Sequence, residues 1–208
     1  MVHGGRSLGE DPTTALQLPL LRMVPVARAI RQALRGSGAV VLRPRLRLRG
    51  WNGAAASPVH DLSELLEELS GRFGPTPVVL VGHSMGARAA LRVAGHPMVS
   101  AVAGLAPWLP LGEPVDQLAG RRVLLAHGSA DHVTSSPETW AYADRARAVT
   151  QVAAIEVRHD GHAMLRRAPL WHRIAAEFTR ASLALPAGAE EVCRAYLRAA
   201  AGPDRVVL

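Results

Sequence analysis

The sequence predicts an α/β protein, with a mostly parallel central sheet of about five or six strands and helices on both faces. Three observations lead to this prediction. Short apolar runs rich in Val, Leu, Ile and Ala alternate along the chain with longer helical patterns. The runs are continuously apolar, which is typical of parallel strands buried on both faces. Strand and helix alternate one by one, which is the order that a parallel sheet requires.

The expected elements follow in chain order. Apolar runs predict strands near 38–43, 77–82, 99–105, 122–127 and 151–157. Helical periodicity predicts helices near 20–35, 58–72, 84–95, 137–149, 169–183 and 188–200. With 208 residues, the chain is expected to form a single domain, 1–208, in which 186–208 is a C-terminal helix with a loose tail.

The charge of the chain does not indicate a nucleic-acid partner. The net charge is +7, and all 24 basic residues are arginines scattered along the sequence rather than gathered in one block. Only four Trp, two Tyr and two Phe are available for stacking on bases. With 49% hydrophobic and 20% charged residues, the composition is that of a folded globular protein.

A cytoplasmic protein without a membrane span is expected. Residues 93–112 carry no Asp, Glu, Lys or Arg, but repeated Gly and Pro residues interrupt them, which argues against a spanning helix. No secretory signal is visible at the start of the chain. The single cysteine, Cys193, excludes an internal disulfide framework and favours a reducing compartment.

Arginine occupies every second position from Arg43 to Arg49. If the segment is extended, these side chains share one face. They would then form either a site for a phosphate or coenzyme A tail, or an exposed sheet edge whose charges discourage strand-to-strand pairing.

The motif with the most specific chemistry is G-H-S-M-G at 82–86. A buried-strand pattern leads directly into it, and a helical pattern follows. This is the context of the G-x-S-x-G nucleophile elbow, in which Ser84 sits in a strained turn with its hydroxyl above the sheet. Side chains at 82 and 86 would collide with neighbouring backbone. The Met85 amide, at a helix N-terminus, is placed to stabilise an oxyanion.

With these residues the chain resembles the α/β-hydrolase family, whose triad runs Ser, then Asp or Glu, then His. The segment from His127 to Asp131, H-G-S-A-D, looks like the family's H-G-x-x-D after a strand. The segment from Asp160 to His162, D-G-H, looks like its histidine loop. The resemblance implies Ser84 as nucleophile, Asp131 as orienting acid and His162 as base. Serine needs such a base, and the carboxylate sets the tautomer of the histidine.

Other assignments remain open from the residues alone. Asp160 or Asp116 could be the acid, and His159 could be the base. His159 and His162 lack a third spaced ligand, so neither a metal nor another cofactor is expected. His83 and His127 are interpreted as scaffold residues beside the turns.

The N-terminus departs from the family pattern. His3-Gly4-Gly5 looks like the family's H-G motif, which implies that the Gly5 amide, or that of its neighbour Arg6, is the second oxyanion donor. Only two residues precede the motif. The usual first two strands are therefore expected to be absent, the third to be a stub, and 38–43 to form the sheet edge. Residues 1–6 are expected to contribute little to the core.

Only 16 residues separate the strands 99–105 and 122–127, so no cap domain is expected and the site should be open. Such an uncapped chain is similar to small esterases, thioesterases and dienelactone-hydrolase-like members. Trp108 and Trp51 follow two of the expected strands and either line the substrate pocket or cover the core. The resemblance implies a serine hydrolase that cleaves a carboxylic ester or thioester of a small molecule. The alternatives are an acyltransferase with the same triad and a non-catalytic binding protein. Nothing in the sequence indicates the oligomeric state.

Overall fold

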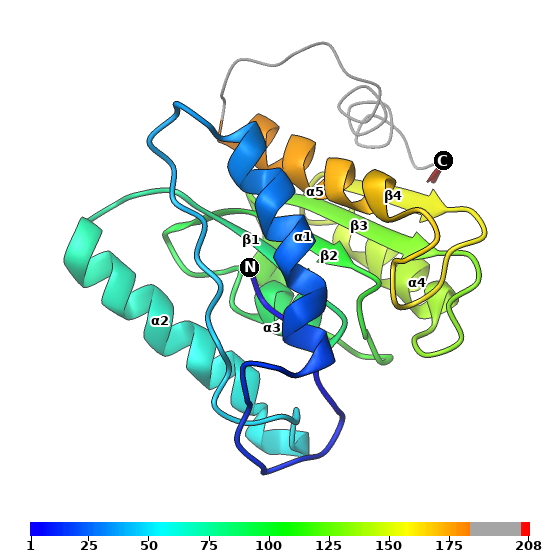
Figure 1. The fold of residues 1–208 in the computed structure, drawn as a ribbon, viewed down its shortest axis with the longest axis horizontal. Helices are drawn as coiled ribbons and strands as arrows, with labels where there is room; N and C mark the ends of the chain where they lie inside the picture. Colours follow the sequence, from blue (N-terminus) through cyan, green and yellow to red (C-terminus); the bar gives the residue numbers. More distant parts are fainter. Residues whose placement is uncertain (184–204) are drawn as a thin grey trace.

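A five-stranded parallel sheet forms the centre of the computed structural model, which describes residues 1–183 and 205–208 (Figure 1). The strands follow one another in space in the order β1-β2-β3-β4-β5, and every neighbouring pair is parallel. Their bounds are β1 Val78–His83, β2 Val99–Leu105, β3 Arg122–Gly128, β4 Val152–Val157 and β5 Val206–Val207. The prediction of an α/β fold with a mostly parallel sheet is confirmed.

Helices cover both faces of the sheet. They are α1 Leu18–Ala33, α2 Ser57–Phe73, α3 Met85–Arg92, α4 Ser136–Ala146 and α5 Ala168–Ser182. Figure 1 shows α1 and α5 side by side on one face, whereas α3 and α4 lie behind the sheet. These bounds agree within a few residues with the expected helices. The sixth expected helix, 188–200, lies outside the described residues.

Two hydrophobic cores explain why the strands are continuously apolar. In β3, Val123 and Leu125 pack into the core beneath α2, α3 and α4. Their neighbours Leu124 and Ala126 pack into the core beneath α1 and α5. Because successive side chains of a strand point to opposite faces, both sets must be apolar when both faces are covered.

The first residues of the chain belong to the core, so the expectation that they contribute little to it is wrong. Val2 is only 1% exposed and lies beside β1 as a parallel bridge to Gly82. Its N–H donates to the Val81 carbonyl (2.8 Å), and its carbonyl accepts from the His83 N–H (3.0 Å). His3 is buried as well. The two-residue stub therefore attaches the segment that follows it to the end of β1.

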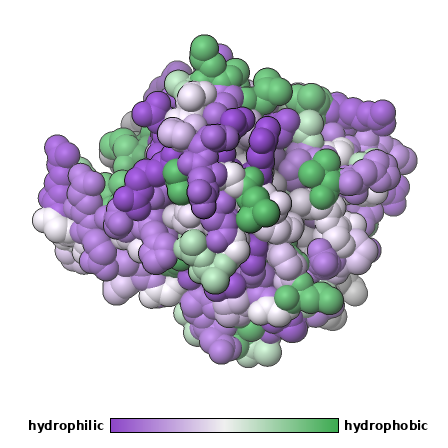
Figure 2. Space-filling view, turned by 90° about the horizontal axis from the view of Figure 1, so that it is seen from below, coloured by the Kyte–Doolittle hydropathy of each residue, from purple (hydrophilic) through white to green (hydrophobic). Residues whose placement is uncertain are grey.

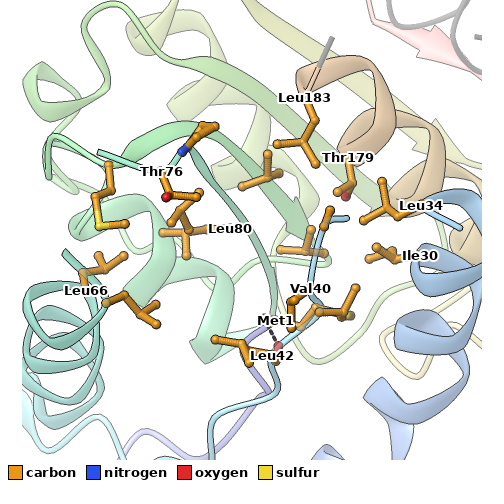
Figure 3. A pocket seen from close by; sticks show the side chains of 18 of the residues that line it. Met1, Ile30, Leu34, Val40, Leu42, Leu66, Thr76, Leu80, Thr179 and Leu183 are labelled. Carbon is orange, nitrogen blue, oxygen red and sulfur yellow. Dashed lines mark hydrogen bonds between the residues drawn. The ribbon is translucent and has the colours of Figure 1, made fainter. Parts of the chain in front are cut away.

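The expected strand near 38–43 does not form. The two-residue stub is too short to carry a ladder to a further strand, and its contact with this segment is a hydrogen bond from the Met1 amino group to the Leu42 carbonyl (2.7 Å) (Figure 3). An apolar cavity of about 630 Å³ lies here, along the open side of β1 and between α1 and α2. Labelled side chains around it include Ile30, Leu66 and Leu80.

The arginines of 43–49 are not on an edge strand either. Arg47 binds Asp61 (2.5 Å) and Glu64 (3.2 Å) of α2, and the segment makes only isolated bridges with residues 6 and 12. The acidic side of α2 therefore holds this segment.

The end of the chain, expected as a loose tail, forms β5. Val206 and Val207 pair with Ile155 and Glu156 of β4, and the Leu208 N–H donates to the Glu156 carbonyl (2.9 Å). Two valines suit such a pairing because β-branched side chains favour strands.

The remaining surface features are simple. Between β2 and β3 the chain forms one short 3₁₀ turn, Asp116–Leu118. Within the described ranges, no helix has both the length and the apolar character that a bilayer crossing requires. Figure 2 shows the molecule from below, with hydrophobic groups in separate patches among hydrophilic ones.

Candidate active site

Ser84 lies in a strained turn between β1 and α3. Its backbone has φ 55° and ψ −120°, a region that non-glycine residues rarely adopt and that costs about 1–3 kcal/mol. Hydrogen bonds hold the turn, because the Ser84 N–H donates to the Leu105 carbonyl (3.1 Å) and the Trp108 N–H donates to the Ser84 carbonyl (3.3 Å). The turn therefore depends on the end of the neighbouring strand β2.

Gly82 and Gly86 are needed for close backbone approach around this turn. A Cβ at Gly82 would overlap the Gly86 carbonyl oxygen and would lie 2.5 Å from the Ala87 Cα. A Cβ at Gly86 would overlap the backbone of the N-terminal stub, at 2.7 Å from the Val2 carbonyl oxygen. The glycines of G-H-S-M-G thus let a strand, a helix and the N-terminal stub meet at one point.

Asp131 and His162 come from loops after neighbouring strands and meet beside this turn. Asp131 follows β3 and His162 follows β4, and His162 Nδ1 lies 2.9 Å from Asp131 Oδ2. Because the carboxylate can only accept, the proton is assigned to Nδ1, which leaves Nε2 free as an acceptor. This is the tautomer that a general base requires.

The Asp131 carboxylate is held in its ionised form. Its side chain is fully buried, and burial alone would raise its pKa. Hydrogen bonds from His127, from His162 and from the amides of Thr134 and Val133 outweigh burial and hold the pKa well below its usual range. The carboxylate therefore stays charged at any pH at which His162 could act as a base.

Two residues around Asp131 were not identified as functional from the sequence. His127 Nε2 lies 3.1 Å from Asp131 Oδ2, and His127 is completely buried at the end of β3. The Thr134 hydroxyl lies 3.0 Å from Asp131 Oδ2 and 3.1 Å from His162 Nδ1. The H-G-x-x-D spacing could have placed His127 near the acid, but no sequence pattern points to Thr134.

His83 positions the backbone of the histidine loop. It is 1% exposed, and its Nε2 donates to the His162 carbonyl (3.0 Å) while its Nδ1 has no hydrogen-bond partner. Burial, with a smaller contribution from the adjacent His162, lowers its pKa to about 3. His83 is therefore neutral at physiological pH. The two imidazole rings lie 4.8 Å apart, centroid to centroid.

The competing candidates lie in other environments. The Asp160 carboxylate accepts from the Trp171 indole N–H (2.9 Å) and from the backbone N–H groups of Arg167 (2.8 Å) and Gly161 (2.8 Å). It therefore stabilises the turn before α5. Asp116 is exposed in the 3₁₀ turn, and His159 is exposed in the loop after β4.

His162 lies beside His83, the residue that precedes Ser84, with the two rings 4.8 Å apart, but it is not hydrogen-bonded to Ser84. Ser84 is 7% exposed, and no hydrogen bond joins its hydroxyl to His162 in the part of the chain that the structure describes. In enzymes without substrate, the bond between nucleophile and base is often long and tightens only when substrate binds.

The N-terminal glycines lie against the turn. A Cβ at Gly4 would be 3.3 Å from the Ser84 Cβ, and one at Gly5 would be 2.7 Å from the Met85 Sδ. The Arg6 N–H donates to the Arg49 carbonyl (2.9 Å), so it is already engaged. Within residues 1–183 and 205–208 the Gly5 N–H has no such acceptor. Of the two neighbouring amides, Gly5 is therefore the one that is free to donate.

Trp51 and Trp108 lie together on one side of the turn. Their rings meet edge to face with centroids 6.1 Å apart, and the Arg88 guanidinium lies 3.8 Å from the Trp51 ring centre and 4.5 Å from that of Trp108. Glu113 is 4% exposed and binds Arg88 Nε at 2.6 Å. Trp51 is 3% exposed and Trp108 is half-buried. Trp108 is thus the more accessible of the two rings.

Neither the large cavity nor a metal cluster coincides with this site. The 630 Å³ cavity is lined by residues 76–81, at the start of β1, whereas Ser84 lies after its end. In the described ranges, no three His, Cys, Asp or Glu side chains gather in a way that could hold a metal ion.

Comparison with known proteins agrees with this fold. The model of the alpha/beta hydrolase family matches residues 1–208. No curated protein matches the chain. Est1E from Butyrivibrio proteoclasticus has a similar solved structure, with a TM-score of 0.64 and 14% identity over 88% of this chain and 86% of that chain.

Two further solved structures have slightly higher sequence identity. The esterase domain of a Rhodothermus marinus protein is 22% identical, with a TM-score of 0.55 over 76% of this chain and 81% of that chain. A putative hydrolase of the alpha/beta superfamily from Xanthomonas campestris pv. campestris is also 22% identical, with a TM-score of 0.56 over 86% and 96%. These likenesses establish the fold, and the family model spans the whole chain. The chain therefore belongs to the alpha/beta hydrolase family and is an enzyme of the hydrolase type.

Proposed function

We propose that the chain is a serine hydrolase that cleaves a carboxylic ester or thioester through an acyl-enzyme intermediate. The observation that carries the proposal is the strained turn at Ser84 beside the hydrogen-bonded pair of His162 and Asp131 (2.9 Å). A serine nucleophile, a histidine of the required tautomer and a buried ionised carboxylate are the three parts that this chemistry needs.

In the acylation step, His162 Nε2 takes the proton of the Ser84 hydroxyl as Oγ attacks the carbonyl carbon. The negative charge that forms on the carbonyl oxygen is stabilised by the N–H groups of Gly5 and Met85. The tetrahedral intermediate collapses, the bond to the leaving oxygen or sulfur breaks, and His162 returns the proton to the leaving group. A water molecule then attacks the acyl-enzyme by the same route, which releases the acid and regenerates Ser84.

Four neighbouring residues have supporting roles in this proposal. Asp131 holds the His162 tautomer and stabilises the imidazolium that forms. His83 orients the His162 backbone through their hydrogen bond (3.0 Å). Trp108 forms the accessible wall of the acyl or alcohol pocket, with Trp51 packed beneath it.

The test is the loss of a reactive serine. Ser84→Ala is expected to abolish turnover of p-nitrophenyl butyrate and labelling by a fluorophosphonate probe, leaving only the roughly 10³–10⁴-fold acceleration over water that an oxyanion hole and binding provide. Ser63→Ala, on the remote helix α2, is the control and should keep both activities.

The result separates the alternatives. Turnover by Ser84→Ala at the wild-type rate would refute the assignment of the nucleophile. A wild-type protein that is folded but neither labelled nor active would refute the proposed serine chemistry. An acyl product that forms only on an added alcohol, and not on water, would indicate an acyltransferase instead.

A further inference from the structure

A second cavity, of about 390 Å³, lies between the start of α1 and the loop that leads from His162 to α5. Leu21 and Val26 of α1 line one side, and Ala163, Met164 and Trp171 line the other. Its volume is typical of a small-molecule site. Because Ala163 directly follows His162 in the chain, the cavity adjoins the proposed base.

Arg22 lines this cavity and has no partner. It is half-buried, and it forms no hydrogen bond or ion pair with any other residue that the structure describes. Burial lowers its pKa, and no acidic group counteracts that effect. Other half-buried arginines, by contrast, bind a carboxylate or a carbonyl: Arg49, Arg88, Arg92, Arg121 and Arg147.

The surroundings of Arg22 contain no competing acid. His172 is the other titratable side chain on the cavity wall, and burial lowers its pKa too. The wall carries no Asp or Glu within the described ranges. Asp160, behind Trp171, is already engaged with the indole N–H (2.9 Å) and with backbone amides. A partly desolvated guanidinium in such a place gains most from an anion that reaches it.

The position of the cavity indicates which part of a substrate reaches it. In the proposed mechanism His162 protonates the leaving group, so the leaving group must lie on the His162 side of Ser84. The cavity walls include the two residues that follow His162, and the charge of Arg22 is close enough to lower the pKa of His83. Arg22 therefore lies on the side of the site to which a leaving group would extend.

We infer that Arg22 binds a carboxylate on the leaving-group side of the substrate. The preferred substrate is then an ester whose alcohol part is a small apolar body that carries an anionic carboxylate. The planar guanidinium fork suits a carboxylate through two parallel hydrogen bonds, and the apolar walls suit the body that carries it. This inference rests on the proposed function, because only a group-transfer reaction has a leaving group.

The experiment compares two esters that differ in charge. They are 4-acetoxybenzoate, which is anionic, and its neutral methyl ester, methyl 4-acetoxybenzoate. The measured quantity is the ratio of their kcat/KM values, in which general effects on catalysis cancel. Arg22→Gln is expected to lower the ratio of anionic to neutral ester by about 10- to 100-fold, the range for loss of a charge-assisted hydrogen bond.

The control is Arg28→Gln, which removes the same charge from an exposed position on the same helix. Its ratio should equal that of the wild type. Arg22→Lys should retain part of the preference, because it keeps the charge without the fork. An unchanged ratio in Arg22→Gln, or an equal fall in Arg28→Gln, would overturn the inference while leaving the proposed function intact.

A binding measurement tests the anion site at Arg22 independently of ester hydrolysis. If the wild type hydrolyses neither ester, titration of 4-hydroxybenzoate into the folded proteins decides about the cavity. The proposed function fails separately, if the wild type neither turns over p-nitrophenyl butyrate nor reacts with the fluorophosphonate probe. Binding that weakens about 10-fold or more in Arg22→Gln but not in Arg28→Gln would support the anion site. Equal binding by both variants, or none by the wild type, would overturn it. Thermal unfolding checks that each variant is folded.

Discussion

Replacing Asp131 with asparagine changes the charge of the proposed orienting acid while keeping its size. In the wild type, Oδ1 accepts from the amides of Val133 (2.8 Å) and Thr134 (3.0 Å), whereas Oδ2 faces His162, His127 and the Thr134 hydroxyl. An asparagine carbonyl can keep the two amide bonds. Its NH₂ group must then face His162, which can no longer donate from Nδ1.

The expected fall in kcat follows from the tautomer that His162 adopts beside the asparagine. With a donor in place of Oδ2, His162 accepts at Nδ1 and carries its proton on Nε2, so it cannot take the proton of Ser84. The expected fall in kcat is about 10⁴-fold, as for other triads with this change. The stability of the fold should change much less than the rate. Loss of the buried acceptor costs about 1–3 kcal/mol of the free energy of unfolding, because His127 can change its own tautomer to relieve the contact.

The assay is the initial rate of p-nitrophenyl butyrate hydrolysis at neutral pH, measured well below the melting temperature of each variant. Asp116→Asn is the exposed control and should match the wild type in rate and in melting temperature. Asp160→Asn should lower the melting temperature, because its carboxylate accepts from the Trp171 indole and from three backbone amides. Its rate at a temperature where it is folded should change far less than that of Asp131→Asn.

Two results would refute this reasoning. A folded Asp131→Asn protein that keeps more than about a tenth of the wild-type rate would mean that Asp131 does not set the tautomer. A collapse of the rate in Asp160→Asn or Asp116→Asn, with a normal melting temperature, would transfer the role of the acid to that residue.

Two further predictions concern the oxyanion donor and the pH dependence. Gly5→Ala should lower kcat by about 10²-fold, the scale of a displaced oxyanion donor, because its Cβ would come within 2.7 Å of the Met85 Sδ. Gly9→Ala is the control and should keep the wild-type kcat, because its Cβ meets nothing closer than 3.5 Å. Equal rates of ester hydrolysis in the two variants would exclude Gly5 from the site. His83 has a folded pKa lowered to about 3 from 6.5, so the unfolded chain binds more protons between these values. Its contribution to the free energy of unfolding is therefore full above pH 6.5 and is lost by up to about 1.4 kcal/mol per pH unit as the pH falls toward 3. His83→Gln, which keeps the donor, should reduce this slope in chemical denaturation, whereas His132→Gln, at an exposed position, should not; equal slopes would contradict the buried neutral His83.

The sequence alone determined four strands of the sheet, β1 to β4, and the turn that carries Ser84. Strand β2 occupies 99–105 as predicted, because a continuous run of small and β-branched apolar residues can only be buried on both faces. The G-x-S-x-G motif places a strand, a turn and a helix within a few consecutive residues, so the turn and its two glycines can be recognised in the sequence. The order of Asp131 and His162 after successive parallel strands also follows from the chain, because such ends meet at one edge of the sheet.

Only the tertiary structure decided which residues contact each other when the sequence offered several candidates of the same type. The segment 38–43 has the composition of a strand, yet it forms none, and the stub contacts it through a hydrogen bond from the Met1 amino group to the Leu42 carbonyl. From the residues alone either Asp160 or Asp131 could be the acid, and the structure separates them by the donors that the fold brings to each. Arg22 is one arginine among 24, and its lack of a partner depends on how α1 packs beside the loop after His162. Local periodicity predicts which secondary structure a segment can form. The partners of a side chain, its burial and whether it stays unpaired depend on contacts between residues far apart in the chain.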